Sequence, residues 1–275
     1  MRDWHIIPEI VGCNATLRMA AMQAVDAVEQ GRHFLVEGEA GSGRRLLARS
    51  AWCRRSPGAR SLFTLDCRMF PSGGAEALLF GEHPSSDATT THLGKPRLAA
   101  GGGLLLLHAE FLALKTQGRL AQALGQSLLL PPGESVQLLM TCTPPAHAPL
   151  ALHSDLAGLL LRVRVPALRE RVEDIRAIAE SLLRDASPLE RIRCSQALID
   201  RFCGYDWPGN VAELRSVLRH LLLEPHNGLL DLRHLANLMC RDETCFALLQ
   251  GGHRPSHIET EFIHRPPSAA SRSMQ

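Results

Sequence analysis

Residues 38–45 read Gly38-Glu39-Ala40-Gly41-Ser42-Gly43-Arg44-Arg45, and this stretch decides the fold. A short apolar run at 33–36 precedes it, and a helical pattern at 44–54 follows it. Two glycines separated by four residues, with a basic residue next, have the spacing of a phosphate-binding loop. In such a loop, backbone N–H groups surround a phosphate at the N-terminus of a helix. The order strand, glycine loop, helix therefore predicts an α/β fold, with all eight residues as candidate nucleotide contacts.

Arg44 stands where phosphate-binding loops usually carry a lysine. Arginine keeps the positive charge, but its planar and bulkier guanidinium does not reproduce the point charge that lysine places over the β- and γ-phosphates. We therefore expect ATP to bind weakly or not at all, and we expect hydrolysis to be inefficient.

Further apolar runs outline a sheet and a helical part. The runs at 62–65, 104–107 and 136–140 predict buried strands, and 159–161 is another short apolar run. Helical patterns occupy 16–30 and 111–124, so strands and helices alternate, which predicts a largely parallel sheet covered on both faces. From residue 173 the strand patterns stop, and helices are expected at 173–185, 195–203, 210–223 and 231–249. These patterns predict an α/β nucleotide-binding subdomain at 9–166, a helical subdomain at 167–249 and a disordered tail at 250–275.

The composition excludes several classes of protein. Thirty basic and 28 acidic side chains give a formal charge of +2, which argues against a chain built mainly to coat nucleic acid. The eight cysteines form no Cys-x-x-Cys pair, and His220, His226 and His234 do not share a helix face, so no metal site is expected. No apolar run approaches the roughly eighteen residues of a membrane span, and the first ten residues lack the apolar core of a signal peptide. We expect a cytoplasmic protein with reduced thiols.

Residues 204–215 read Gly204-Tyr205-Asp206-Trp207-Pro208-Gly209-Asn210-Val211-Ala212-Glu213-Leu214-Arg215. Pro208 and Gly209 predict a turn, and Asn210 is predicted to be the N-cap of the helix that follows. The stretch resembles the Tyr-x-Trp-Pro-Gly-Asn-Val-Arg-Glu-Leu-x-Asn signature in the central AAA+ domain of the bacterial activators of sigma-54 RNA polymerase.

Other motifs of these sigma-54 activators occur in the same order between about residues 10 and 240. They are Ile10-Val11-Gly12, the phosphate loop with Glu39, Leu79-Phe80-Gly81 and Leu168-Arg169-Glu170-Arg171-Val172-Glu173-Asp174-Ile175. The resemblance implies an α/β AAA+ P-loop NTPase core with a parallel sheet, followed by a small helical lid subdomain. It also implies ATP as the ligand, ring assembly, and a role in transcription regulation.

The magnesium and water-activating positions of the resembled family are altered. Its Walker B strand ends Gly-Gly-Thr-Leu-Phe-Leu-Asp-Glu, whereas this chain reads Gly101-Gly102-Gly103-Leu104-Leu105-Leu106-Leu107-His108. Leu107 stands at the aspartate linked to Mg²⁺, and His108 stands at the glutamate that activates water. A leucine cannot organise Mg²⁺, which takes oxygen ligands, and Glu110 lies two positions too far along to substitute simply. We expect no Mg²⁺ site and no catalytic residue.

The remaining working positions differ as well. The resemblance assigns the two sensor positions to Thr143 and Ala212 and the two arginine-finger positions to His153 and Leu159, with Arg162 and Arg164 downstream. The loop that contacts sigma-54, Gly-Ala-Phe-Thr-Gly-Ala in the family, reads Ser85-Ser86-Asp87-Ala88-Thr89-Thr90 here, so we do not expect the usual contact with the polymerase. In phosphoryl transfer an arginine finger alone is worth roughly 10³–10⁵ in rate.

The pattern favours a catalytically impaired pseudo-ATPase that modulates a related activator. The expected partner is another sigma-54 activator AAA+ subunit, in a homo- or hetero-oligomer. No helix-turn-helix that binds DNA is expected, because residues 231–250 leave room only for one or two lid helices. Three alternatives stay open: a divergent but active ATP-hydrolysing activator that uses Arg44, His108 or Glu110 in new roles, a module that binds ATP without turnover, and a decaying gene copy.

Overall fold

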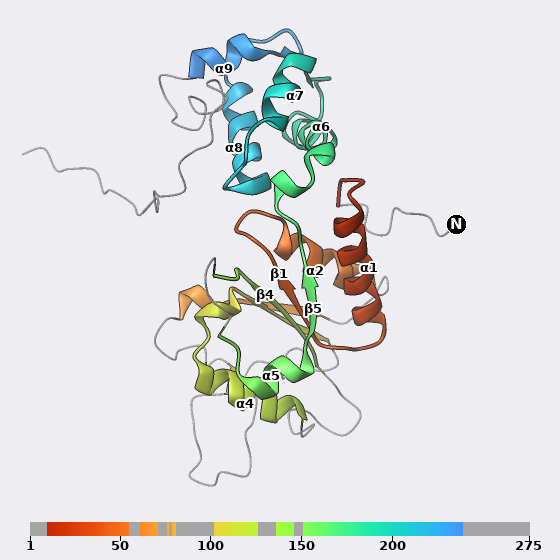
Figure 1. Ribbon diagram of the computed structural model, residues 1–275, viewed down its shortest axis with the longest axis vertical. Helices are drawn as coiled ribbons and strands as arrows, with labels where there is room; N and C mark the ends of the chain where they lie inside the picture. The colour runs from red at the N-terminus through yellow and green to blue at the C-terminus, as the bar shows by residue number, and fades with distance from the viewer. Residues whose placement is uncertain are drawn as a thin grey trace, which may run out of the picture.

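The computed structural model describes residues 10–54, 61–70, 76, 79–80, 102–125, 136–145 and 151–238. A parallel five-stranded sheet forms its lower part, and a cluster of helices lies above the sheet (Figure 1). The expected sigma-54 contact loop at 85–90 and the tail at 250–275 lie outside the described residues. None of the described helices is long and apolar enough to cross a membrane.

The sheet has the strand order β2-β3-β4-β1-β5. Its strands are β1 (Phe34–Glu37), β2 (Leu62–Asp66), β3 (Gly103–Leu107), β4 (Gln137–Cys142) and β5 (Leu161–Arg164). Every neighbouring pair is parallel. β3 and β4 are buried along their whole length, as expected for central strands that have helices on both faces.

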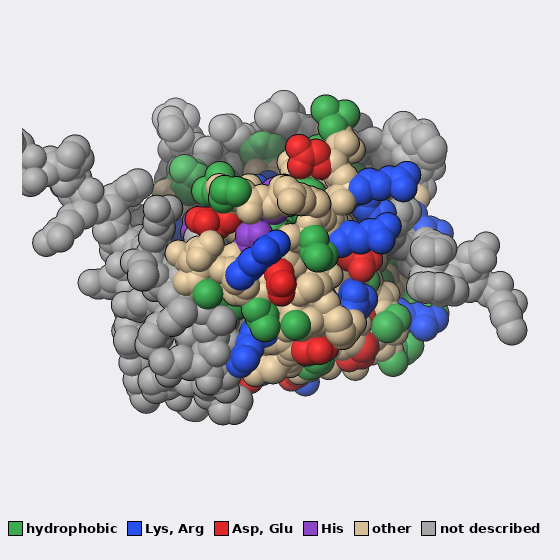
Figure 2. All heavy atoms as spheres, turned by 90° about the horizontal axis from the view of Figure 1, so that it is seen from above, with side chains coloured by type: hydrophobic (Ala, Val, Ile, Leu, Met, Phe, Trp, Pro, Cys, Tyr) green, Lys and Arg blue, Asp and Glu red, His purple; other side chains and the backbone are tan. Residues whose placement is uncertain are grey.

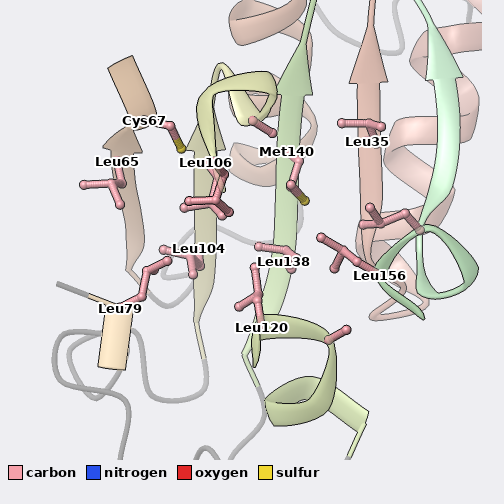
Figure 3. Packing of buried hydrophobic residues seen from close by; sticks show 14 of the residues in the cluster. Leu35, Leu65, Cys67, Leu79, Leu104, Leu106, Leu120, Leu138, Met140 and Leu156 are labelled. Carbon is pink, nitrogen blue, oxygen red and sulfur yellow. The ribbon is translucent and has the colours of Figure 1, made fainter. Parts of the chain in front are cut away.

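Alternation along the strands divides the core into two layers. Phe34 and Val36 of β1 pack on one face against α1 (Ala15–Glu29) and α2 (Arg44–Cys53), whereas Leu35 points to the other face. That second face is covered by α4 (Leu114–Gly125) and α5 (Ser154–Leu159), and Figure 3 shows Leu104, Leu106 and Leu138 packed there. Because successive side chains of a strand point to opposite faces of the sheet, one apolar run supplies residues to both layers of the core.

The position of β5 was predicted poorly from the sequence. The apolar run at 159–161 mostly belongs to the end of α5 and the turn after it, and the strand itself is Leu161–Arg164. Among the described strands β5 pairs only with β1, and of its four residues only Val163 is fully buried, while Arg162 and Arg164 are exposed. An edge strand with one solvated face alternates polar and apolar residues and does not form a continuous apolar run.

The lid has a core of its own. It contains α6 (Ile175–Ala186), α7 (Gln196–Cys203), α8 (Asn210–Leu221) and α9 (Leu232–Leu238), and two short 3₁₀ turns, Leu168–Glu170 and Val172–Asp174, lead into it. Trp207 is fully buried there, with Phe202 and Tyr205 packed edge-on at ring distances of 5.5 and 5.1 Å. The expectation that strands stop at residue 173 was wrong, because β6 (Arg193–Cys194) and β7 (Leu229–Leu230) pair in parallel. Two-residue strands are too short to leave a periodic signal.

Figure 2 shows the molecule from the lid end, where acidic and basic side chains lie interspersed on the visible surface. No single-sign field covers this face, which agrees with the nearly balanced charge of the sequence. The parallel AAA+ sheet followed by a helical lid confirms the fold class expected from the sequence.

Candidate nucleotide site

The glycine loop connects the end of β1 to the start of α2, as the sequence predicts. Gly41 adopts φ +75°, and a Cβ atom on it would overlap the carbonyl oxygen of Gly209 in the lid. Glycine is therefore required at this position both for its backbone conformation and for the close approach of the lid. The turn before α8 consequently rests directly on the apex of the phosphate loop.

Asn210 holds this contact between lid and loop together. Its side-chain oxygen accepts the N–H of Leu168 at 2.7 Å, and its amide nitrogen donates to the carbonyl oxygen of Ala40 at 2.9 Å and to Glu39 at 3.1 Å. The residue is fully buried and adopts the left-handed conformation at φ +53°. One side chain thus joins the phosphate loop, the segment after β5 and the first residue of α8.

The prediction that Asn210 caps α8 was wrong. Asn210 is the first helical residue, the cap position falls on Gly209, and the Gly209 N–H is accepted by the carboxylate of Glu213 at 2.8 Å. Asparagine tolerates left-handed backbone, which lets its side chain turn toward the phosphate loop and away from the helix N-terminus.

Glu39 is held from two sides. Arg169 donates two hydrogen bonds to its carboxylate, at 2.8 and 2.5 Å, and Asn210 donates a third. The bonds from Arg169 are the main cause that lowers the pKa of Glu39, although burial opposes them. Glu39 is therefore committed to the contact with the lid and keeps its negative charge.

Three buried donors around the loop have no hydrogen-bond partner among the described residues. They are the Ser42 hydroxyl, Nη1 of Arg44 and Nε of Arg171, on side chains that are 2%, 7% and 3% exposed. Burial lowers the pKa of both guanidinium groups. Unpaired buried donors are costly, and a phosphate oxygen would satisfy them. The loop thus keeps donors for an anion even though the lysine has been replaced.

A cavity of about 450 Å³ adjoins two of these donors, Ser42 and Arg171, between the core and the lid. Ser42, Gly43 and Arg171 line it on the phosphate-loop side, and Ile10, Val11 and Ile178 supply apolar lining. Arg171 also donates to the carbonyl oxygen of Ser42 at 2.8 Å, so it ties the lid to the loop. The apolar side of the cavity suits the base of a nucleotide, and the cationic side suits its phosphates.

Asp174 fixes the N-terminal segment that closes this cavity. Its carboxylate accepts the N–H groups of Cys13 and Asn14 at 2.5 and 3.2 Å, and the Asn14 side chain donates to Glu173 at 2.7 Å. Asn14 also caps α1 by accepting the N–H of Leu17 at 3.1 Å. Glu173 and Asp174, two of the three acidic residues of the motif at 168–175, therefore hold residues 13–14 and, through them, the neighbouring Ile10 and Val11.

Leu107 and His108 lie at the end of β3, as predicted, but neither offers an oxygen ligand. Leu107 is 5% exposed and packs in the apolar layer beneath α1 and α2. His108 adopts φ +56°, and its N–H donates to the Thr141 hydroxyl at 3.2 Å. The described residues contain no group of three metal-binding side chains. Mg²⁺ needs oxygen ligands, which the side chains of Leu107 and His108 do not supply.

Two carboxylates lie near these positions, because Asp66 of β2 pairs in register with Leu107 and Glu110 lies beside His108. One oxygen of Glu110 lies 3.5 Å from Nδ1 of His108, while the other is buried and has no partner among the described residues. Burial is the main cause that raises the pKa values of the Cys67 and Cys142 thiols to about 12. The negative charge of Glu110 contributes to both increases. Its charge therefore faces the carboxyl ends of the central strands.

The two sensor positions are occupied by uncharged side chains, Ala212 and Thr143. Ala212 packs beside Gly41, where its methyl group offers no charge to a phosphate. Thr143 follows β4 and is half-buried, whereas Thr141, two residues earlier, makes the contact with His108. Thr141 could not be recognised from the sequence, because a single hydroxyl in an apolar strand resembles an ordinary core position.

The residues at the two arginine-finger positions, His153 and Leu159, lie in and just before α5. The His153 ring accepts the N–H of Asp155 at 3.4 Å and lies so close to Gly118 that a Cβ there would be 2.9 Å from Nε2. Leu159 is 39% exposed and has no charge to offer. Downstream, Arg162 pairs with Glu37 at 2.9 Å and Arg164 pairs with Glu170 at 2.8 Å.

Comparison with known proteins agrees with this arrangement. Residues 10–142 match the Sigma-54 interaction domain and residues 169–245 match the AAA+ ATPase lid domain. The anaerobic nitric oxide reductase transcription regulator NorR of Vibrio vulnificus is 30% identical over 228 residues, which cover 77% of this chain and 44% of that protein. The regulatory protein LuxO of Vibrio parahaemolyticus is 28% identical over 233 residues, covering 78% and 51%.

Solved structures show the same fold. NtrX from Brucella abortus in complex with ADP is 20% identical, with a TM-score of 0.66 over 81% of this chain and 54% of that chain. This chain spans about half the length of the relatives it matches. The two domain matches, in the same order as the sheet and the lid, show that the chain belongs to the sigma-54 interaction domain family of AAA+ transcription regulators.

Proposed function

We propose that this chain is a pseudo-ATPase in transcription regulation, which binds nucleotide weakly at most and modulates a related sigma-54 activator in the cytosol. The observation that carries the proposal is Leu107, an apolar side chain packed into the core at the position of the metal-linked carboxylate. Phosphoryl transfer depends on a metal ion to neutralise the charge that develops on the phosphate.

The neighbouring residues support the same conclusion. No carboxylate follows Leu107 directly to orient water, because the next residue is His108. His108 adopts left-handed backbone, and its N–H donates to the Thr141 hydroxyl. His153 is used as the cap of α5, so it is not an extended cation that reaches toward another subunit. The positions of the metal ligand, the water-orienting base and the trans arginine are thus occupied by Leu107, His108 and His153, and this triple replacement supports a loss of phosphoryl transfer.

Weak nucleotide binding is supported by the donors that remain. The backbone of the glycine loop is unaffected by side-chain replacement. Within the part of the chain that the structure describes, the Ser42 hydroxyl and the Arg44 and Arg171 guanidinium groups each keep a buried N–H or O–H without a partner. A nucleotide would place its phosphates against these groups and its base in the cavity lined by Ile10, Val11 and Ile178.

The partner follows from ring architecture, in which each subunit completes the site of its neighbour. Inserted beside an active relative, this chain would present His153 where the neighbouring phosphate requires an arginine. A subunit that occupies a place in the ring without supplying that charge lowers the ATPase rate of the assembly. The role is therefore that of a regulatory subunit.

The test is a titration of this chain into a purified sigma-54 activator from the same organism, with phosphate release as the readout. We expect the rate to fall as the chain is added, and we expect the two proteins to co-elute on size exclusion. His153→Arg restores a cation at the same position and should weaken the inhibition without abolishing co-elution. Unchanged rates at several-fold excess, together with separate elution, would rule the proposal out.

A further inference from the structure

One cationic side chain of the lid faces the cavity at the phosphate loop. Arg215 lies on α8 and lines this cavity together with Ser42, Gly43 and Arg171. Arg215 is exposed and forms no hydrogen bond or ion pair with any residue that the structure describes. Three other exposed arginines each pair with a glutamate, namely Arg164, Arg169 and Arg176. The charge of Arg215 is therefore not used to hold the described fold together.

The start of α8 is fixed on the phosphate loop, which limits where Arg215 can reach. The turn at Gly209 meets Gly41, and Ala212 in the first turn of α8 lies beside Gly41. Arg215 comes three residues after Ala212, on the same side of the helix, and is the first cation along α8. Long side chains of a helix lean toward its N-terminus. An arginine at position 215 can therefore extend back along α8 toward the loop.

The wall of the cavity carries more positive than negative charge. Arg171 and Arg215 supply two cations, and Asp185 of α6 is the one carboxylate among the described residues that line the cavity. Asp185 forms no ion pair within the described part of the chain. The Ser42 hydroxyl and Nε of Arg171 are buried donors that also lack a partner there. An anion in this cavity would thus meet donors from both the loop and the lid.

We propose that Arg215 is the contact of the lid with the phosphates of a bound nucleotide, which thereby bridges α8 and the phosphate loop. The role of Arg215 is to bind, because it adds an attractive charge and takes no part in bond cleavage. The inference deepens the proposed function and rests on its nucleotide site. Inorganic pyrophosphate carries phosphates without a sugar or base, so it should detect this contact by itself.

The first experiment measures the binding of pyrophosphate and of ADP by calorimetry to the wild-type chain, Arg215→Gln and Arg219→Gln. Arg219 is also exposed and lies one turn further along α8, where it lines a neighbouring groove but not this cavity. Both variants remove one positive charge from the same helix. We expect Arg215→Gln to weaken both ligands on the order of fivefold, as suits an exposed charge, and Arg219→Gln to leave both affinities unchanged. Arg215→Lys should recover most of the loss.

Two further measurements separate a direct contact from an effect on folding. Urea unfolding of Arg215→Gln without ligand should match the wild type, because the side chain is exposed and has no partner in the described chain; a destabilised variant would instead give Arg215 a structural role. The difference in pyrophosphate affinity should shrink in about 1 M salt, where the Debye length is about 3 Å. A difference that salt does not change would contradict a contact between charges.

The binding results that would overturn the inference are distinct from a failure of the proposed function. Unchanged affinity in Arg215→Gln, or equal losses in Arg215→Gln and Arg219→Gln, would show that Arg215 makes no specific contact. Weaker binding of ADP alone would place Arg215 at the sugar or the base. Wild-type protein that does not bind millimolar pyrophosphate would also overturn the inference, yet it would leave the proposed pseudo-ATPase standing. ATP turnover by the chain would do the reverse.

Discussion

Replacement of Asn210 tests the contact by which the lid rests on the phosphate loop. Asn210→Ala removes the acceptor of the Leu168 N–H and the donor to the Ala40 carbonyl oxygen, at 2.7 and 2.9 Å. The Asn210 side chain is fully buried, so water cannot readily replace these bonds. The loss should separate the lid from the loop as well as destabilise the chain.

The size of the effect follows from the contacts. Each net hydrogen bond contributes about 1 kcal/mol, and a buried group left without a partner costs about 1–3 kcal/mol. Alanine at φ +53° adds about 1 kcal/mol of backbone strain. We therefore expect Asn210→Ala to lower the free energy of unfolding by about 3–4 kcal/mol, and Asn210→Gly, which removes the strain, by about 1 kcal/mol less.

Asn210→Asp is the discriminating variant. It keeps the acceptor for Leu168 but places a carboxylate against Glu39 and the Ala40 carbonyl oxygen, which asparagine contacts as a donor. We expect it to be destabilised despite its nearly identical shape, with the deficit smaller at low pH, where the new carboxylate is protonated. The assay is urea unfolding followed by tryptophan fluorescence, which reports on Trp207 in the lid and Trp52 in the core. Wild-type stability in both Asn210→Ala and Asn210→Asp would refute the reasoning.

Three further predictions concern the backbone, a histidine and the thiols. Gly41→Ala should cost clearly more stability than Gly31→Ala, because the two glycines have similar φ values, +75° and +69°, but only Gly41 meets the lid; equal melting temperatures would contradict this. Burial lowers the pKa of His33 from its ordinary value of 6.5, and its ring accepts the N–H of Leu138, so stability should be fully present above pH 6.5 and fall below it. Urea unfolding at several pH values checks this, and His33→Gln should show a smaller fall. Burial raises the pKa values of Cys67, Cys142 and Cys194 to about 12, so mass spectrometry after iodoacetamide treatment should find them modified only in denaturant.

The sequence predicted best what depends on continuous runs. β1, β3 and β4 are central strands, and their uninterrupted apolar residues marked them within one or two positions. The glycine loop was recognisable because its spacing is fixed by backbone geometry. The edge strand β5 was located only partly, because its solvated face breaks the apolar pattern.

The site was harder to predict because its key contacts join distant segments. Asn210, Arg171 and Asp174 bind Ala40, Ser42 and Cys13 across separations of at least 129 residues. A local rule assigned Asn210 to helix capping, and the tertiary contact with the loop prevailed over that rule. The replacements at Leu107 and His108 could be recognised from the resemblance to the family, but the buried donors of Ser42, Arg44 and Arg171 that lack a partner among the described residues required the three-dimensional arrangement.

The most direct test of the central claim is a single-turnover hydrolysis experiment with radiolabelled ATP and excess purified protein. An enzyme whose chemical step is merely slow still releases labelled phosphate under these conditions, whereas a site without a metal ligand, a water-orienting base and a finger does not. We expect no phosphate above the buffer control, in magnesium or in EDTA, and the same result after Leu107→Asp and His108→Glu together. Phosphate release by the unaltered chain that requires magnesium and disappears in Arg44→Ala would contradict the account.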